Sequence, residues 1–192
     1  MPSSFTLYGG TAIALHLGHR ESIDFDFFGT ENFDPRALAN VIPFLAGAQI
    51  TQIEPNTLTA IVDRDGPVKM SFFGLPWMGR VEAPRISEDI GLKIASLVDL
   101  AGAKASVVQA RAEAKDYIDI DALIMNGINL ATALSAAAAV HGNSFNPQAS
   151  LKALTYFADG NLATLNEGLK SRLVDAVRLV DLDHLPRLVA MP

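Results

Sequence analysis

The sequence predicts an α+β fold, with a mixed or antiparallel sheet in its first half and helices in its second. Runs of β-favouring residues separated by turn residues occupy the chain up to about residue 86, and helical periodicity dominates from residue 87 on. The 192 residues, 49% of them hydrophobic and 19% charged, are enough for one or two packed domains. We therefore expect an α/β core over residues 1–86 and a helical region over residues 87–192 that completes the site and packs on the core.

The charge and the residue types exclude several classes of function. Fifteen Lys and Arg against 21 Asp and Glu give a net charge of -6, so no general basic surface exists for nucleic-acid binding. The chain has no Cys, which excludes disulfides and thiolate chemistry and leaves carboxylates and four His as metal ligands. No stretch reaches the roughly 18 to 20 apolar residues of a membrane span, and the first residues, MPSSFTLYGG, lack a secretory signal pattern. We expect a cytoplasmic protein of bacterial type without a membrane partner.

The chain begins with a strand, a tight turn and a helix. Residues 5–8 favour a strand, Gly9-Gly10 interrupts it, and residues 11–17 carry apolar side chains at helical spacing until Gly18. His16 lies within this helix and is predicted to pack rather than to bind a ligand.

The second strand carries two carboxylates. Residues 22–28, SIDFDFF, alternate strictly, with Ile23 and two phenylalanines on one face and Asp24 and Asp26 on the other. Thirteen residues separate Gly10 from Asp24, which is enough for one helix and a return beside the first strand. The spacing therefore predicts that both carboxylates lie next to the glycine turn.

The residues after the second strand predict one helix and three strands. Asp34-Pro35 predicts the start of a helix that runs to about residue 44. Residues 48–53, 57–62 and 68–73 predict three strands of an antiparallel meander, because turn residues separate them.

The second half is predicted to be helical. Ser87-Glu88-Asp89 can cap a helix, and three helical patterns follow it. The clearest of the later amphipathic helices spans residues 166–180.

The first half holds a constellation that fits phosphate and metal chemistry. A Gly-Gly turn before a helix exposes backbone N–H groups to an anion, and Thr11 can add a hydroxyl. Two carboxylates at i and i+2 can share divalent cations, and Mg²⁺ prefers carboxylates, water and substrate phosphates. Taken singly, a Gly-Gly turn is usually only a turn, and paired Asp are usually a solvated face. Arg20, between the two features, either helps to hold phosphate or belongs to a surface loop.

Residues 9–28, GGTAIALHLGHRESIDFDFF, resemble the signature of the nucleotidyltransferase AbiEii/AbiGii toxin family, within the DNA polymerase β-like nucleotidyltransferase superfamily. The resemblance implies a polymerase β-like core and Mg²⁺-dependent transfer of NMP from an NTP to a hydroxyl of RNA, tRNA or protein. Two ions would bind with the NTP, and an antitoxin protein would be the partner. Gly9, Gly10 and Thr11 would hold the triphosphate, and Asp24 and Asp26 would hold the metal.

The resemblance extends to later residues. The superfamily usually supplies a third carboxylate from a later strand, and Ser71 stands at that position. EDIGLKIASL resembles a helical element with Lys93, which could neutralise a triphosphate. AKDYIDIDAL resembles a second element, in which Lys115 would bind nucleotide and Asp116 would orient the attacking hydroxyl or act as a base; Asp119 shares its helix face.

Three alternatives stay open. Lys104 and Arg111 are rivals of Lys93 for the cationic role, and EAKDYIDID is also typical of an ordinary amphipathic helix. The chain could be a catalytically degenerate nucleotide-binding or interaction module, an interpretation that Ser71 and the start of the chain close to the GGT strand both favour. A generic phosphate-binding α+β protein is a third interpretation. The acceptor, the preferred base and the oligomeric state leave no readable motif.

Overall fold

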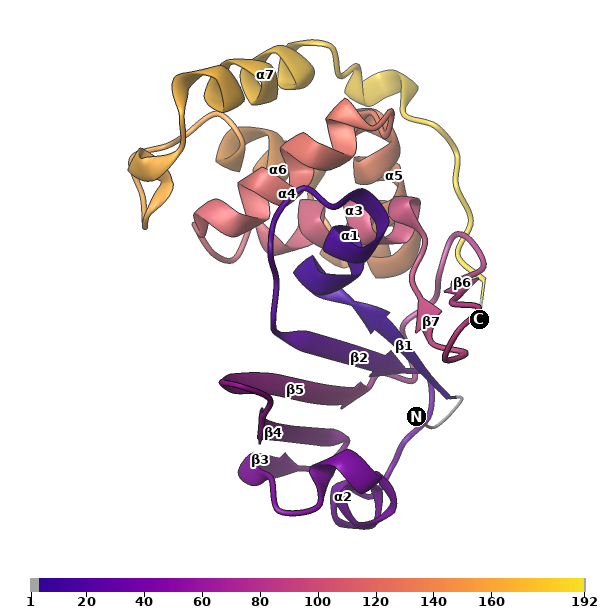
Figure 1. Ribbon diagram of the computed structural model, residues 1–192. Coiled ribbons are helices and arrows are strands. Elements are labelled where there is room, and N and C mark those ends of the chain that lie inside the picture. Colours follow the sequence, from indigo (N-terminus) through magenta and orange to yellow (C-terminus); the bar gives the residue numbers. More distant parts are fainter. Residues whose placement is uncertain (1–3, 192) are drawn as a thin grey trace. The chain divides into compact units, whose positions relative to one another are not determined.

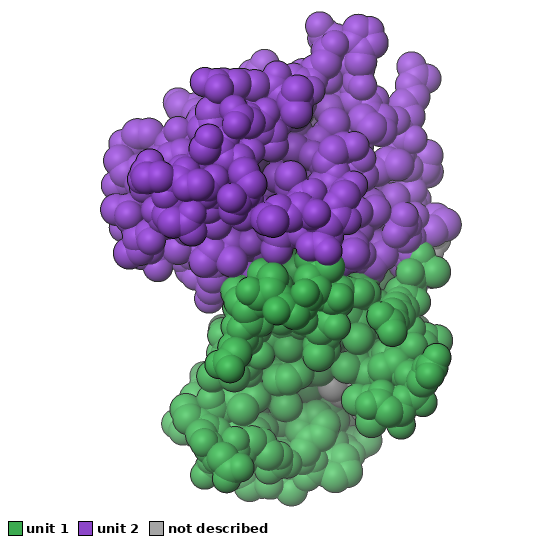
Figure 2. Space-filling view, turned by 45° about the horizontal axis from the view of Figure 1, so that its top comes forward, with its two compact units in different colours: residues 1–79, 83–95, 192 green, residues 80–82, 96–191 purple. Residues whose placement is uncertain are grey.

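The computed structural model describes residues 4–191, which form one seven-stranded mixed sheet and a set of helices (Figure 1). This confirms the predicted fold class. The chain folds as two compact units, coloured separately in Figure 2. The first comprises the described residues up to Gly79 together with Ala83–Ala95, and the second comprises Arg80–Glu82 and Ser96–Met191.

The first unit contains the whole sheet, in the strand order β3-β4-β5-β2-β1-β7-β6. β1 is antiparallel to β2 and parallel to β7, β2 is parallel to β5, and the pairs β3–β4, β4–β5 and β6–β7 are antiparallel. Its elements are β1 (Phe5–Tyr8), α1 (Gly9–Leu17), β2 (Phe25–Gly29), α2 (Pro35–Val41), the 3-10 turn η1 (Pro43–Leu45), β3 (Gln49–Glu54), β4 (Thr57–Asp63), β5 (Pro67–Gly74), β6 (Arg85–Ile86) and β7 (Lys93–Ile94).

The meander and the capped helix predicted from the sequence are confirmed. β3, β4 and β5 match the three predicted strands to within one residue at each end. The helix predicted to follow Asp34 is α2 and then η1, and the Asp34 carboxylate caps it by accepting hydrogen bonds from the backbone N–H groups of Arg36 and Ala37. Pro43 ends α2 early, because a residue before proline disfavours the α region.

Two neighbouring rows of side chains show how the sheet separates core from site. One row crosses five strands on the core face, through Leu7, Phe27, Phe72, Leu58 and Ile53. Its first four members are at most 2% exposed, and the rings of Phe27 and Phe72 stack at 5.0 Å. Because successive residues of a strand point to opposite faces, the adjacent row lies on the other face. That row is Tyr8, Asp26, Ser71, Thr59 and Gln52.

The second strand is shorter than predicted. We expected a strand over residues 22–28, but β2 begins at Phe25, so Asp24 precedes the strand and Ile23 is 60% exposed. The reason is the neighbour: β1 ends at Tyr8, opposite Asp26, where the chain turns into α1. Residues before Phe25 therefore have no antiparallel partner from β1.

The prediction that a helix starts at Ser87 is wrong. Residues 85–86 and 93–94 form the β6–β7 hairpin, and the Ser87 hydroxyl accepts a hydrogen bond from the backbone N–H of Leu92 within its turn. The helix begins only at Leu97, after Ser96, whose hydroxyl accepts from the backbone N–H of Asp99. Both serines precede an acidic residue, so the local sequence did not decide between them.

The second unit is helical, as predicted for the later residues. Its elements are α3 (Leu97–Val107), α4 (Ala114–Met125), α5 (Leu130–His141), η2 (Gly142–Ser144), α6 (Pro147–Ala153), η3 (Leu162–Thr164), α7 (Glu167–Arg178) and η4 (Leu182–His184). Among residues 4–191 no single helix is long and apolar enough to cross a membrane, although the bent pair of α4 with residues 130–144 passes that test by length and composition.

Asp99 joins the short segment 80–82 to the second unit. Its carboxylate is 6% exposed and accepts from the backbone N–H groups of Val81 (2.6 Å) and Glu82 (3.1 Å) and from the Ser96 hydroxyl (2.7 Å). Asp99→Ala should lower the free energy of unfolding by about 1–3 kcal/mol, because the buried Ser96 hydroxyl and two partly buried backbone N–H groups lose their acceptor. Urea unfolding measures this loss. Asp175→Ala, which breaks an exposed pair with Arg178, is the control and should change stability by no more than about 0.5 kcal/mol.

Candidate active site

The glycine turn lies against the Asp26 carboxylate, as the spacing predicted. Gly9 is the first residue of α1 and has a φ of +73°. A Cβ built on Gly9 would lie 2.8 Å from Asp26 Oδ2, closer than any side chain allows. The strand register also places Asp26 beside the glycine turn, because Asp26 lies opposite Tyr8, the residue before the turn. Gly9 therefore suits both the positive φ, which strains a residue with a Cβ, and the proximity of the carboxylate, which a Cβ would force to shift.

Gly9→Ala tests whether the expected metal site depends on this turn. The positive φ alone costs about 1–2 kcal/mol for a residue with a Cβ, and the new methyl group would displace the Asp26 carboxylate. Gly18→Ala is a matched control, since Gly18 has a φ of +61° and no atom within 4 Å of its built Cβ. We expect both variants to lose stability in thermal unfolding, and only Gly9→Ala to lose Mg²⁺-dependent nucleotide binding. Equal binding by both variants would contradict the assignment.

Thr11 fixes the segment that carries Asp24. Its hydroxyl donates to the backbone carbonyl of Asp24 and lies 2.8 Å from the Ser22 hydroxyl. Thr11 is 3% exposed, so its side chain is a tie between α1 and the approach to β2. The sequence suggested a hydroxyl for phosphate; the hydroxyl found here instead holds the backbone of a carboxylate.

The two carboxylates suit a metal that takes part of its ligands from substrate. Asp24 and Asp26 are half-buried, and Ser71 lies directly opposite Asp26 on β5, where a third carboxylate was expected. In the part of the chain that is described, no three His, Cys, Asp or Glu side chains are grouped to hold a metal. Mg²⁺ is commonly bound by one or two carboxylates, with waters and phosphates as its other ligands. The donor set therefore fits Mg²⁺ in the presence of an NTP.

Three other residues of the first unit that the sequence analysis named lie in α1 or in the loop before β2. Gly10 follows Gly9 in the first turn of α1, and Arg20 donates to the carbonyl of Glu21 in the loop before β2. The Nε2 atom of His16 lies 2.9 Å from the Ala95 carbonyl oxygen, which confirms it as a packed histidine.

The second unit contains a buried charge cluster. Lys104, on α3, places its Nζ 2.6 Å from Asp116 Oδ1 and 2.7 Å from Asp119 Oδ2, both on α4. The side chain of Lys104 is 7% exposed, and those of the two aspartates are fully buried. Asp116 and Asp119 share a helix face, as predicted, and the residue between them in space is Lys104.

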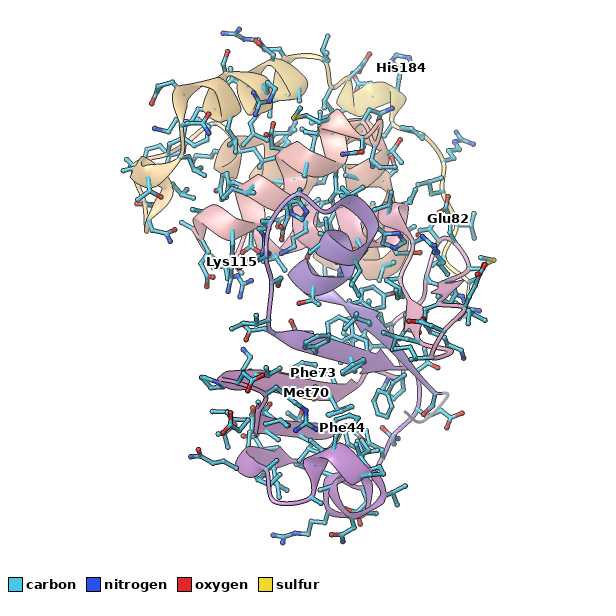
Figure 3. All side chains as sticks on the ribbon, in the orientation of Figure 1. Phe44, Met70, Phe73, Glu82, Lys115 and His184 are labelled. Atoms are coloured by element: carbon cyan, nitrogen blue, oxygen red, sulfur yellow. The ribbon has the colours of Figure 1, made fainter. Side chains whose placement is uncertain are left out.

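Arg111 completes the cluster from its edge. Its Nε donates to Asp116 Oδ2 at 2.7 Å and its Nη2 to Asp116 Oδ1 at 3.1 Å, while its side chain stays 45% exposed. Burial raises the pKa of Asp116, but the hydrogen bonds from Arg111 and the charge of Lys104 outweigh it and hold that pKa below its ordinary value. The Asp116 carboxylate is therefore charged, and both of its oxygens accept hydrogen bonds from Lys104 or Arg111. Lys115, labelled in Figure 3, pairs with Glu113 at 3.1 Å in the first turn of α4.

Lys93 does not occupy the predicted kind of element. It lies on β7, in the first unit, and not on a helix. The lysine that contacts Asp116 is Lys104, which the sequence offered only as a rival. A signal was available: Lys104 falls at helical spacing among Leu100, Ala101 and Ala105, all of which are buried. A lone lysine on an apolar stripe needs a buried carboxylate as partner.

Two known proteins resemble this chain in sequence or in fold. A protein from Aquifex aeolicus (strain VF5), described as uncharacterized, is 33% identical over 120 residues, which are 62% of this chain and 56% of that protein. The chain thus spans a little over half the length of this curated relative. MenT4, a nucleotidyltransferase toxin from Mycobacterium tuberculosis H37Rv, superimposes with a TM-score of 0.59 over 93% of this chain and 77% of its own, at 14% identity, and so shares the fold.

The family model gives the most extensive match. The model described as "Nucleotidyl transferase AbiEii toxin, Type IV TA system" covers residues 2–185. This range includes the glycine turn, both carboxylates of the first unit and the charge cluster of the second. The chain therefore belongs to the AbiEii nucleotidyl transferase toxin family of type IV toxin–antitoxin systems.

Proposed function

We propose that this protein is a Mg²⁺-dependent nucleotidyltransferase that moves NMP from an NTP to a hydroxyl of an RNA, such as tRNA, or of a protein. The observation that carries the proposal is the contact between the glycine turn and Asp26, which brings backbone N–H donors and a carboxylate to one place. As the toxin of its pair, the protein would act in the cytoplasm and be countered by an antitoxin protein.

The proposed role of each residue follows from its chemistry. The N–H groups at Gly9 and Gly10 would bind triphosphate oxygens, helped by the positive end of α1. Asp24 and Asp26 would hold Mg²⁺, which when bound polarises the α-phosphate and stabilises the leaving pyrophosphate. Thr11 keeps the backbone of Asp24 in place. The acceptor oxygen forms a bond to the α-phosphorus, the bond from that phosphorus to the bridging oxygen breaks, pyrophosphate leaves, and the hydroxyl proton passes to solvent.

The later residues have less direct roles in the proposal. Asp116 is fully buried and bonded to Lys104 and Arg111, which favours a positioning role over that of a base. Arg111 and Lys115, each about half exposed, are proposed as cationic groups that bind nucleotide. Lys93 and Arg20 are proposed as further cationic contacts of the triphosphate.

Labelled nucleotides test the proposal. The purified chain with Mg²⁺, each NTP in turn, and pools of RNA and protein should attach label from an α-phosphate and not from a γ-phosphate. This difference separates nucleotidyl transfer from a kinase reaction. If neither label transfer nor Mg²⁺-dependent NTP binding occurs, the proposed function fails. A small neighbouring reading frame that encodes a DNA-binding protein would identify the antitoxin.

One observation favours a second candidate function. Ser71 occupies the position opposite Asp26, and a serine cannot supply a charged metal ligand. A nucleotide-binding module without catalysis would bind an NTP in the presence of Mg²⁺ and transfer no label to any acceptor. Binding without transfer is therefore the result that selects this alternative.

A further inference from the structure

β3 is an edge strand whose outer side has no strand partner. It stands at one end of the sheet order, and within the described residues 4–191 its one strand neighbour is β4 (Figure 1). All six residues of β3 are exposed. An edge strand presents backbone N–H and C=O groups that another strand can pair with, and natural edges are usually protected by Pro, by charged residues, above all Lys, or by bulges. β3, with the sequence QITQIE, has no Lys or Pro, and its one charged residue and its bulge leave Ile50 and Ile53 each 38% exposed.

A bulge gives β3 one apolar and one polar face. Ile50 lies opposite Ala60 and Ile53 opposite Leu58, and the register shifts between Ile50 and Gln52. Directly opposed residues share a face, and Ala60 and Leu58 are two residues apart. Ile50 and Ile53 therefore lie on the same face although they are three apart, which the extra residue of the bulge makes possible.

The polar residues of β3 share the other face. Gln49, Gln52 and Glu54 lie opposite Ile61, Thr59 and Thr57. Gln52 donates to the Glu54 carboxylate at 3.1 Å and accepts from the Thr59 hydroxyl at 3.4 Å. The strand thus ends the sheet with two isoleucines, each 38% exposed, on the core side and amides and a carboxylate on the opposite side.

The two faces of β3 match those of β3 in a second copy of the chain. When two copies of β3 run antiparallel with Ile50 opposite Ile53 of the second copy, Gln49 falls opposite Glu54 and Thr51 opposite Gln52. Apolar residues then meet apolar residues on one face, and an amide meets a carboxylate on the other. A slip of one residue sets Ile50 opposite Gln52 or Glu54, which lie on the wrong face. A slip of three residues keeps the faces matched but pairs only three residues of each β3, so the register described here is the longest one that satisfies both faces.

We infer that two copies of this chain pair through β3 in this register and form a symmetric dimer with one continuous sheet. The two-fold axis repeats the Ile50–Ile53 contact twice. The occupant of the edge is a second copy because the strand matches its own sequence in both face and chemistry.

Ile53→Lys tests the pairing, because it places a charge in the interface twice. The protein concentration at which half of the dimer has dissociated should rise at least about tenfold. Analytical ultracentrifugation over the widest range of protein concentrations that solubility allows measures this change. Ile86→Lys is the matched control: it lies on β6, the opposite edge of the sheet, is 60% exposed, and should leave the dimer unchanged. Circular dichroism checks that both variants fold.

The absence of Cys allows the register to be tested directly. Mild oxidation of a mixture of Ile50→Cys chains and Ile53→Cys chains should give a disulfide-linked dimer, whereas each variant alone should give little, because the register does not oppose identical residues. A chain that is monomeric at every concentration overturns the inference. So does a dimer that Ile53→Lys leaves intact, or crosslinking that is equally efficient in either variant alone.

Discussion

Asp26→Asn should reduce nucleotidyl transfer by about a thousandfold or more, since a metal ligand contributes several kcal/mol to stabilising charge in phosphoryl transfer. Asn keeps the shape of the side chain next to Gly9 but loses the charge that holds a cation. The chain should fold normally, because Asp26 is only half-buried. The measurement is the rate of label transfer from an α-labelled NTP.

A second measurement separates metal binding from catalysis. A ligand that binds only the folded state raises the unfolding temperature, so Mg²⁺ with an NTP should stabilise the unmodified chain and not Asp26→Asn. Asp65→Asn is the control: it removes the same charge in the same unit, at a turn residue with a φ of +56° that Asn tolerates well. If Asp26→Asn transfers label as fast as Asp65→Asn, Asp26 is not a metal ligand.

The candidate site of the first unit could be predicted because its determinants are local. The glycine turn, the α1 helix and the return to Asp26 lie within 18 consecutive residues, from Gly9 to Asp26. Each step in that segment has a sequence signal: paired glycines, helical spacing, a terminating Gly18 and alternation. What the sequence could not show was the role of Thr11, because its acceptor is a backbone carbonyl thirteen residues away.

The later elements and the charge cluster of the second unit were harder to predict because their determinants are tertiary. Ser87 and Ser96 both begin acceptable capping patterns, and the choice depends on whether residues 93–94 can pair with β1, which lies far away in the sequence. The partner of Asp116 depends on which face of α3 packs on α4. Sequence spacing named Lys93 and Lys104 as candidates, but only packing brings Lys104 to the carboxylate.

Lys104→Met should be among the most destabilising substitutions in the second unit. Met preserves the length and packing of the side chain, but it leaves the buried carboxylates of Asp116 and Asp119 without the cation between them. Breaking a buried pair in this way costs about 3–5 kcal/mol, which for a chain of this size lowers the unfolding temperature by roughly 6–20 °C.

Two further variants identify the cause of that loss. Asp119→Asn in the Lys104→Met background should recover part of the stability, because it removes one of the two buried negative charges that contact Lys104 in the unmodified chain. Arg178→Met removes a positive charge whose partner, Asp175, is exposed, and should cost at most about 0.5 kcal/mol. No recovery in the double variant would mean that Lys104 acts through packing alone.

The pH dependence of stability should be weaker in Lys104→Met. In the unmodified chain the pKa of Asp116 is lowered from its ordinary 3.8, so its contribution is complete above that value and is lost as the pH falls through the folded-state pKa. Lys104 supplies part of that lowering through its charge and its hydrogen bond, so Lys104→Met should shift the pKa of Asp116 upward while Arg111 continues to lower it. The variant should therefore lose less stability than the unmodified chain as the pH falls from neutral through 3.8 and below, because the charged form of its Asp116 carboxylate is stabilised less. Urea unfolding across that range, with Arg178→Met as reference, distinguishes the two; parallel curves would show that Lys104 does not set the ionisation of Asp116.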